Sequence, residues 1–313
     1  MSEIRPDAPS GRLARAWDSD LAYSFRTSPV ALVAGVVAVI IILAAILAPW
    51  IAPQNPFNPA ELILMDGFTP PMSESAMSGT YYLLGSDNQG RDVFSAILYG
   101  ARISLFVGVS AVLFAMVLGV TLGLIAGYRG GWLDSVLMRI ADVQLTFPSI
   151  LLALLIFGVA RGFIPSEYRE AMAIYVLILA IGLSDWVQYA RVVRGATMVE
   201  NSKEYVQAAR VIGAHPVKIL ARHILPNVMG PVLVIGTIGL ALAIIAEATL
   251  SFLGVGVPPT QPSLGTLIRI GQGFLFSGEW WILFFPAMAL LALALSVNLL
   301  GDWLRDALNP RLR

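Results

Sequence analysis

The sequence contains no cysteine and only two histidines, His215 and His223, in 313 residues. The lack of cysteine excludes disulfides, thiol catalysis, iron–sulfur clusters and cysteine-ligated zinc, and two histidines are too few for a histidine-rich metal site. Charged residues make up 13% of the chain, compared with about 25% in a typical soluble domain. Together with 57% hydrophobic residues and a mean hydropathy of +0.77, this shortage of charge predicts an integral membrane protein.

The sequence also lacks the features of a nucleic-acid-binding protein or an enzyme. Its formal net charge is zero, so no basic surplus indicates binding to nucleic acid. The phosphate-binding pattern G-x-x-x-x-G-K-[ST] is missing, and neither Lys203 nor Lys218 follows a glycine-rich turn. No set of nucleophile, base and orienting residue is visible, and no metal cluster either. We therefore expect a non-catalytic chain without a cofactor of its own.

Six apolar windows are long enough to cross a bilayer. Residues 30–48 form nineteen positions without a charged or polar side chain, which at about 1.5 Å per residue matches a hydrocarbon core of about 30 Å. This window is too long for a signal-peptide core of about 7 to 15 residues, so we expect an uncleaved signal anchor. The other windows lie near residues 104–127, 136–160, 172–190, 229–252 and 281–300. The windows predict an all-α integral membrane protein with six transmembrane helices.

The distribution of lysine and arginine predicts the orientation, because both resist translocation. If the N-terminus lies inside, fifteen of the twenty Lys and Arg residues fall in inner segments and five in outer ones. Both termini are therefore predicted to be cytoplasmic. Trp50, Trp280 and Trp281 then fall at outer edges of the spans. Trp132 and Trp303 fall at inner edges, as is typical of interfacial indoles.

Two loops are long enough to contain structure of their own. Residues 49–101 include six prolines in their first half, so we expect an irregular start and a small periplasmic subdomain. The inner loop at residues 191–228 is basic and has helical patterning. The predicted division is a cytoplasmic segment 1–28, the first transmembrane helix with the periplasmic subdomain 29–101, a five-helix core 102–304 and a cytoplasmic tail 305–313.

Within the inner loop, residues 201–212 have the pattern of a short amphipathic helix. Asn201 with Glu204 three residues later predicts a helix start. Apolar positions then follow at the spacing of one helical face, and Gly213 is expected to end the helix. The residues of that face are Tyr205, Ala208, Ala209 and Ile212.

A second short helix is expected directly afterwards. Pro216 can occupy its first turn, and Pro226 is expected to end it. Val217, Leu220 and Ile224 share one face of this helix. A pair of helices with an apolar stripe and basic flanks either lies on lipid head groups or docks into a groove of another protein.

This loop resembles the EAA loop of permease subunits of ATP-binding cassette (ABC) importers. Residues 204–210 read EYVQAAR, which is similar to the EYVxAAR of the peptide-type branch, with Gln207 where the general family has glutamate. In that family the loop contains the coupling helix, which inserts into the ATPase subunit. The resemblance therefore implies ATPase contacts for one set of residues. These are Glu204, Tyr205, Gln207, Ala208, Ala209, Gly213, Ala214, His215, Leu225 and Pro226.

Three further stretches resemble the C-type permeases of dipeptide and oligopeptide importers. They are residues 83–105, LLGSDNQGRDVFSAILYGARISL, the glycine-rich residues 127–134, and residues 247–265, EATLSFLGVGVPPTQPSLG. Asp87 and Asp92 in the first stretch lack the spacing of a calcium-binding loop. The resemblance extends from about residue 25 to 311 and implies the type I ABC importer permease fold.

The resemblance also implies a function and partners. The chain would form half of a translocation pathway in the bacterial inner membrane, surrounded by lipid, for peptides or for related solutes such as nickel, glutathione, some sugars and opine-like compounds. A B-type permease paralogue would form the other half, and a periplasmic binding protein would deliver the cargo. ATP and Mg²⁺ would bind to two separate ATPase subunits. The alternative is a stand-alone secondary transporter or channel, which predicts inverted repeats and interrupted helices, and no clear repeat is visible.

Three acidic residues, Asp142, Asp185 and Glu247, lie in or near the spans, where an ionisable side chain costs at least about 2.5 to 3.5 kcal/mol. Asp142 and Asp185 are near predicted inner ends. We expect Arg139 or Arg191 to neutralise them. Glu247 has no basic neighbour in its span, so two interpretations stay open: it lines the pathway, or it makes a buried structural hydrogen bond.

One span carries a regular row of glycines. Gly119, Gly123 and Gly127 recur every four residues and share one helical face. Small residues at this spacing allow two helices to approach closely in lipid. The row therefore predicts a tight helix–helix contact.

Overall fold

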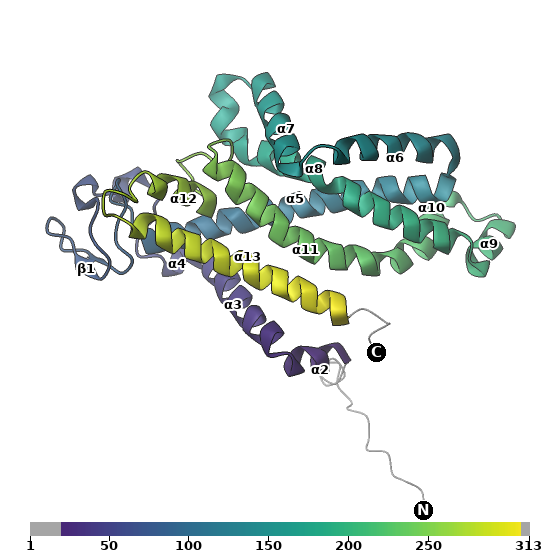
Figure 1. Ribbon diagram of the computed structural model, residues 1–313, viewed down its shortest axis with the longest axis horizontal. Coiled ribbons are helices and arrows are strands. Elements are labelled where there is room, and N and C mark those ends of the chain that lie inside the picture. Colours follow the sequence, from purple (N-terminus) through teal and green to yellow (C-terminus); the bar gives the residue numbers. More distant parts are fainter. Residues whose placement is uncertain (1–19, 308–313) are drawn as a thin grey trace, which may run out of the picture.

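Long apolar helices make up most of the computed structural model, which describes residues 20–307 (Figure 1). In that part of the chain, five helical segments are long and apolar enough to cross a membrane, and a sixth crossing is reached if one bent pair of helices counts as a single span. The five segments are Pro29–Ile46, Val93–Arg129, Ser166–Asn201, Pro216–Phe252 and Trp281–Ala307. The predicted all-α membrane fold is confirmed, while the predictions for residues 1–19 and 308–313 lie outside the described residues.

The first span begins with a strong helix-start sequence. Helix α2 (Asp20–Thr27) ends just before Ser28, whose hydroxyl caps α3 (Pro29–Ile46) by accepting a hydrogen bond from the backbone N–H of Ala31 at 3.3 Å. Pro29 occupies the first turn of α3, where it needs no N–H partner. Helix α4 (Ala48–Ile51) follows directly. The predicted first span, residues 30–48, therefore matches α3 and the start of α4.

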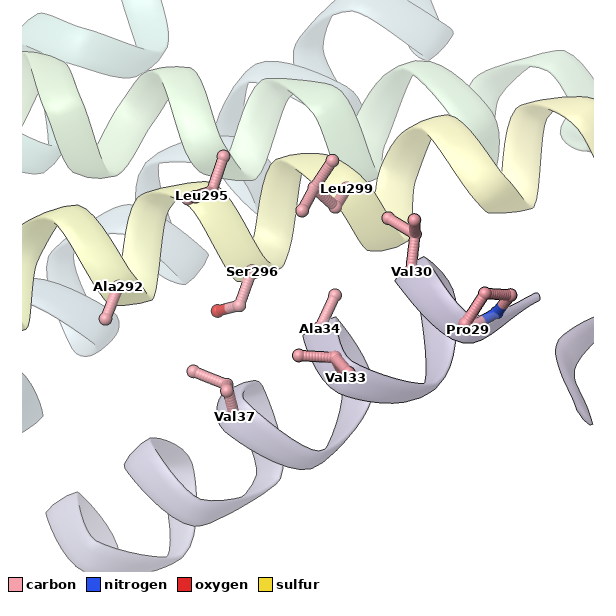
Figure 2. Close-up of a pocket in the computed structure, with 9 residues that line it drawn as sticks. All are labelled: Pro29, Val30, Val33, Ala34, Val37, Ala292, Leu295, Ser296 and Leu299. Atoms are coloured by element: carbon pink, nitrogen blue, oxygen red, sulfur yellow. The ribbon is translucent and has the colours of Figure 1, made fainter.

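Helix α3 packs along α13 (Trp281–Ala307), and an apolar groove of about 510 Å³ separates part of the two helices. Val33 and Val37 of α3 lie across this gap from Ala292 and Ser296 of α13 (Figure 2). Apolar surface of this kind is at no disadvantage in a membrane, because lipid tails are as apolar as the side chains. The groove is consistent with a lipid-facing position of α3.

The window predicted at residues 136–160 is not one straight span. Helices α6 (Gly131–Leu145) and α7 (Ser149–Phe163) are bent by 99° at the break between them, and α7 stands away from the long axis of the bundle (Figure 1). Pro148 lies at this break. Proline disfavours the helical conformation of the residue before it, here Phe147, so the helix stops. The predicted span in this window is therefore met only if the bent pair counts as one crossing.

Helices α5 (Val93–Arg129) and α8 (Arg169–Asn201, preceded by the 3₁₀ turn η3, Ser166–Tyr168) are in close contact through the glycine row. A Cβ atom on Gly119 or Gly123 would lie only 2.5 Å from the carbonyl oxygen of Trp186 or Ala190, respectively. A Cβ atom on Gly127 would lie 2.7 Å from a carbonyl oxygen of α8. The predicted tight contact is confirmed, and its partner is α8.

The largest apolar core lies where α5, α7, α8 and α11 (Leu225–Phe252) meet. Val107, Phe157, Leu177 and Val232, one from each of these helices, are all buried in it. The inner loop contains α9 (Glu204–Val211), α10 (Pro216–Ile219) and a π-helical segment, η4 (Leu220–Ile224), that leads into α11. Figure 1 shows α9 and α10 at one end of the bundle, with α2 and the C-terminal end of α13 in the same half of the molecule.

The opposite end of the bundle carries a small irregular unit. It contains the 3₁₀ turns η1 (Pro59–Glu61) and η2 (Leu64–Asp66) and an antiparallel pair of short strands, β1 (Ser73–Glu74) and β2 (Tyr81–Tyr82), with Ser73 opposite Tyr82. Helix α12 (Leu264–Gln272) lies at the same end (Figure 1). Helix α5 begins at Val93, so residues 93–101 belong to this long helix. The predicted boundary at residue 101 had instead assigned them to the periplasmic subdomain.

A buried carboxylate holds the two strands against the rest of the outer unit. Asp66 accepts hydrogen bonds from the hydroxyls of Ser75 and Ser78, and from the hydroxyl of Tyr82 at 3.0 Å. Burial acts to raise the pKa of Asp66, but these hydrogen bonds together outweigh it and hold the pKa below its ordinary value. Burial, with Asp66 beside it, raises the pKa of Tyr82. The network therefore stays ionised at Asp66 and protonated at Tyr82 at neutral pH.

Candidate coupling and translocation sites

The inner loop begins differently from the sequence prediction. Asn201 is the last residue of α8, and Lys203 is the N-cap of α9, so the predicted capping role of Asn201 is wrong. Helix α8 simply continues through the predicted cap, and the chain turns only at residues 202 and 203. Asn201 instead braces this turn: its backbone oxygen accepts a hydrogen bond from the Gln207 side chain at 2.9 Å, and its side-chain oxygen accepts one from Arg210.

The turn between α9 and α10 follows the sequence prediction. Gly213 has a φ of +77°, a conformation that favours glycine, and it ends α9. The backbone N–H of Ala214 donates to the carbonyl oxygen of Ala209 at 3.0 Å, which closes the helix end. His215 caps α10 through its Nδ1 atom, and Pro216 occupies the first turn. The predicted stop and restart are therefore both confirmed.

The second helix does not end at Pro226. The N–H of Leu225 donates to the carbonyl oxygen of Leu220, five residues earlier, in the π-helical segment η4. Pro226 then sits in the first turn of α11, so α10, η4 and α11 form one continuous helical path. A π turn is wider than an α turn and gives the proline ring room. The predicted end of the helix at Pro226 is therefore wrong.

One face of α9 is largely exposed in the part of the chain that the structure describes. Of the predicted apolar stripe, Ala209 is buried, whereas Tyr205, Ala208 and Ile212 are exposed. Ile212 is 82% exposed and the neighbouring Val211 is 87% exposed. Adjacent exposed apolar side chains at a helix end are typical of a contact surface for another molecule. On α10 and η4, likewise, the predicted apolar face is divided, with Ile224 buried and Val217 exposed.

Tyr205 connects α9 to both neighbouring helices. Its hydroxyl donates a hydrogen bond to the Glu200 carboxylate of α8 and accepts one from the Asn227 side chain of α11 at 2.8 Å. The hydrogen bond to Glu200 raises the pKa of Tyr205. Glu204, the first residue of α9, is exposed. A displacement of α9 would therefore act on α8 and α11 through Tyr205.

Two ion pairs fasten α6 to α8. Asp134 receives two hydrogen bonds from the Arg194 guanidinium, at 2.5 and 2.6 Å, and Asp142 pairs with Arg191. The bidentate pair of Arg194 with Asp134 fixes orientation as well as distance. The predicted pairing of Asp142 with an arginine is confirmed.

Asp185 is not neutralised in this way. It is the middle residue of α8, and Arg191, one of its two predicted partners, binds Asp142. No basic side chain forms an ion pair with Asp185 in residues 20–307. The prediction is wrong because α8 extends well past the predicted span of 172–190, so Asp185 lies deeper in the bundle than the sequence indicated.

Glu247 is fully buried, at 0% exposure, between α5 and α11. Its carboxylate accepts hydrogen bonds from the hydroxyls of Ser104 and Ser251, both at 2.7 Å. The same two hydroxyls accept hydrogen bonds from the backbone N–H groups of Leu264 and Val257, respectively. Glu247 therefore connects α5, α11 and the segment that leads into α12, as the buried hydrogen-bond interpretation requires.

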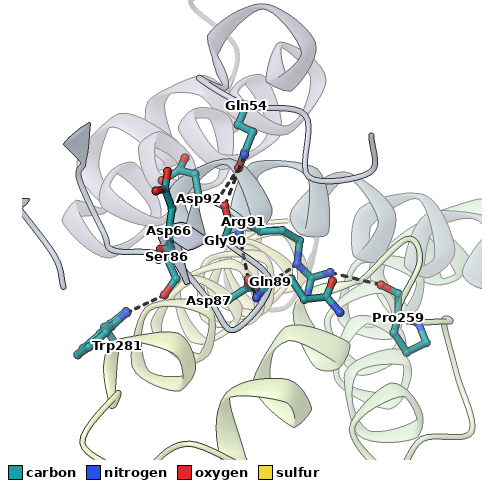
Figure 3. Close-up of polar contacts among 10 residues, drawn as sticks. All are labelled: Gln54, Asp66, Ser86, Asp87, Gln89, Gly90, Arg91, Asp92, Pro259 and Trp281. Carbon is teal, nitrogen blue, oxygen red and sulfur yellow. Dashed lines mark hydrogen bonds and ion pairs between the residues drawn. The ribbon is translucent and has the colours of Figure 1, made fainter. Parts of the chain in front are cut away.

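A buried ion pair organises the end of the bundle that carries α12 (Figure 3). The Nε atom of Arg91 lies 2.6 Å from a carboxylate oxygen of Asp87, and both side chains are buried. Arg91 also donates to the carbonyl oxygen of Pro259 at 3.5 Å, and Trp281 donates to the carbonyl oxygen of Ser86 at 3.1 Å. The segment before α5 is thus tied to the loop before α12 and to the start of α13.

Comparisons with known proteins agree with this geometry. The sequence model of the family described as "Binding-protein-dependent transport system inner membrane component" matches residues 119–313. The chain belongs to this family. A second model, the N-terminal transmembrane domain of oligopeptide transport permease C, matches residues 15–71 of the permease.

Curated relatives match the permease over nearly its full length. It is 37% identical to the dipeptide transport system permease protein DppC of Haemophilus influenzae, over 98% of this chain and 97% of the relative. It is also 37% identical to the oligopeptide transport system permease protein OppC of Bacillus subtilis, over 94% of this chain and 90% of the relative. The predicted resemblance to this family is therefore confirmed.

A solved structure has the same fold. The inward-facing methionine ABC transporter MetNI matches with a TM-score of 0.52 and 18% identity, over 68% of this chain and 96% of that chain. The permease therefore has the type I fold and is a non-catalytic, multi-pass subunit of an ABC importer. Its family implies that an ATPase and a binding protein act with it as separate chains.

The environment of Glu247 leads to a first prediction. Glu247→Ala leaves two buried serine hydroxyls without their acceptor, and each such group costs about 1 to 3 kcal/mol. We expect the yield of monodisperse permease after solubilisation to fall several-fold. Glu247→Gln keeps the shape and one acceptor oxygen, so its yield should stay within about twofold of the parent. Size-exclusion chromatography of the two variants measures this difference.

Uptake assays separate the two interpretations of Glu247. If it acts through the hydrogen bonds alone, Glu247→Gln transports in proportion to the amount of folded permease. A Glu247→Gln permease that folds normally but has lost most of its transport would instead indicate that the carboxylate lines the pathway in another conformation. The pathway role of Glu247 stays a prediction until that measurement.

Proposed function

We propose that this permease forms half of the translocation pathway of a peptide importer in the bacterial inner membrane. The observation that carries the proposal is the 37% identity to DppC over 98% of the chain, together with 37% identity to OppC. Both relatives are named for the transport of short peptides. In this proposal, a B-type permease paralogue forms the other half, since the peptide-type branch usually pairs two different permeases.

The end of the bundle that carries α9 and α10 is cytoplasmic in this proposal, and the end that carries β1 and α12 is periplasmic (Figure 1). The count of basic residues supports this orientation, because fifteen of twenty fall in the segments assigned to the inside. Helix α2 and the end of α13 lie in the same half as α9, in agreement with two cytoplasmic termini.

The loop 191–228 is the proposed coupling site. The ATPase subunit, which carries ATP and Mg²⁺, docks on the exposed face of α9 that includes Val211 and Ile212. Closure of the two ATPase subunits moves α9. Tyr205 passes this movement to α8 and α11, and the bundle rocks between inward-open and outward-open states. The other proposed contact residues are Glu204, Gln207, Ala208, Ala209, Gly213, Ala214, His215, Leu225 and Pro226.

Copurification tests this proposal directly. A tagged permease is expressed from its native operon, solubilised gently and purified, and the chains that accompany it are identified by mass spectrometry. We expect a second permease and ATPases that contain phosphate-binding loops. If the permease is recovered alone and moves solute in liposomes without ATP, the importer proposal is contradicted in favour of a secondary transporter.

A further inference from the structure

A cavity of about 410 Å³ lies beside Asp185, where the bend between α6 and α7 meets α8 and α11. Gln144, at the end of α6, and Gln188 of α8 supply polar groups to its wall. Leu242 and Ile245 of α11 supply apolar surface. The cavity therefore combines a carboxylate, amide groups and an apolar wall beside the middle of α8.

The Asp185 carboxylate has no positive partner in this cavity. The lining residues include no Lys, Arg or His. The amide nitrogen of Gln144 is already used, because it donates to the carbonyl oxygens of Leu183 and Ser184 at 2.9 and 3.0 Å. Its amide oxygen accepts a hydrogen bond from Trp186 at 2.9 Å. Gln144 is thus fixed by the backbone of α8, and it does not neutralise Asp185.

The carboxylate of Asp185 disfavours contact of this side of the permease with lipid. An ionisable residue at the centre of a membrane helix is costly unless it is paired or faces water. Leu242 is 52% exposed and Ile245 is also exposed, so the cavity opens to the outside of this single chain. In the proposed importer, the second half of the pore covers this opening. The carboxylate then points toward the space between the two halves.

We propose that the Asp185 cavity is a cation-accepting subsite of the translocation pathway, which receives the ammonium group of the cargo. The inference rests on the proposed function, since every peptide with a free N-terminus carries an ammonium group at neutral pH. A carboxylate binds an ammonium group by a charge-assisted hydrogen bond. Gln188 lies one helical turn from Asp185 on the same wall and supplies a neutral hydrogen-bonding group beside it.

Cysteine labelling tests whether the electrostatic potential in the cavity is negative, and it requires no knowledge of the cargo. The chain has no native cysteine, so Gln188→Cys introduces a single thiol on this chain within the full transporter. Its modification is followed by mass spectrometry of the permease. The reagents are the cationic 2-aminoethyl methanethiosulfonate and the anionic 2-sulfonatoethyl methanethiosulfonate. Each rate is divided by the rate of the same reagent with free 2-mercaptoethanol.

We expect the cationic reagent to react about tenfold faster than the anionic one after this correction, because a full charge lies within a few ångströms of the thiol. Adding Asp185→Asn should bring the ratio close to one. Glu170→Gln is the matched control, since it removes a negative charge from the start of the same helix, beyond the screening distance of about 10 Å. Equal rates with Asp185 intact, or no labelling in either the nucleotide-free or the ATP-bound transporter, would overturn the proposal.

Uptake into proteoliposomes provides the second test. With the binding protein and internal ATP, Asp185→Asn should lower the initial rate of peptide uptake about tenfold, which corresponds to about 1.4 kcal/mol, and Asp185→Glu should restore most of it. The amount of assembled transporter should stay within about twofold of the parent. Normal uptake by Asp185→Asn contradicts the subsite. Failure of the unmodified transporter to take up peptide contradicts the proposed cargo instead, and it leaves the labelling ratio as an independent measure of the site.

Discussion

Ile212→Asp should abolish ATP-driven uptake while the permease itself stays folded in the membrane. The Ile212 side chain is 82% exposed at the end of α9, so an aspartate there disturbs little packing among residues 20–307. In the assembled transporter the same position is proposed to enter an apolar groove of the ATPase. A carboxylate buried there without a partner costs several kcal/mol, so we expect uptake to fall at least about a hundredfold.

Ile212→Leu is the matched control, because it keeps the size and apolar character of the side chain and should retain uptake. The ATPase that copurifies with each variant is quantified alongside uptake. Loss of uptake together with loss of the ATPase supports a docking surface. If Ile212→Asp transports normally, the coupling assignment of α9 is wrong. Retained ATPase with weakened membrane attachment of the loop would favour the lipid head-group interpretation.

The elements that the sequence predicted well are those determined by local chemistry. The apolar residues 30–46 lie in helix α3, and Ser28 and Pro29 begin it. Gly213 ends α9 because its φ is positive, and Pro216 begins α10 because its first turn requires no N–H. The glycine row of α5 likewise predicted a close contact, although only the structure identifies α8 as the partner.

The predictions that failed depend on geometry beyond one turn of helix. Pro148 was visible in the sequence, but the hydropathy of residues 136–160 averages over it and hides a bend of 99°. Pro226 looked like a helix end because the π-helical segment that accommodates it has no clear sequence pattern. In both places the backbone conformation around a proline decided the outcome.

The surroundings of the buried acids could not be predicted at all from spacing. Ser104, which donates to Glu247, is 143 residues away in the sequence, and only the packing of α5 on α11 brings the two together. Asp185 was expected to pair with Arg139 or Arg191, because all three residues lie near predicted inner ends of the spans. Arg191 instead forms an ion pair with Asp142 of α6. The Asp185 carboxylate therefore has no arginine partner there and lines the cavity.

Gly123→Leu should prevent the permease from folding into a stable bundle. A Cβ atom at this position would lie 2.5 Å from the carbonyl oxygen of Ala190 and 2.9 Å from the Cβ atom of Val193. Neither neighbour can give way easily, because a backbone carbonyl and a branched side chain are both held by α8. The two helices must therefore separate along the contact, and overpacking of this kind costs about 1 to 3 kcal/mol or more.

Helices in a membrane are held together by close packing rather than by the hydrophobic effect, so a separated α5–α8 contact has little to replace it. We expect the amount of monodisperse permease to fall about tenfold or more, measured by size-exclusion chromatography after solubilisation. Gly158→Leu is the matched control: Gly158 lies in the apolar helix α7, and nothing lies within 4 Å of its added Cβ atom. Equal yields of the two variants would show that α5 and α8 do not depend on this contact, and the glycine row would then need another explanation.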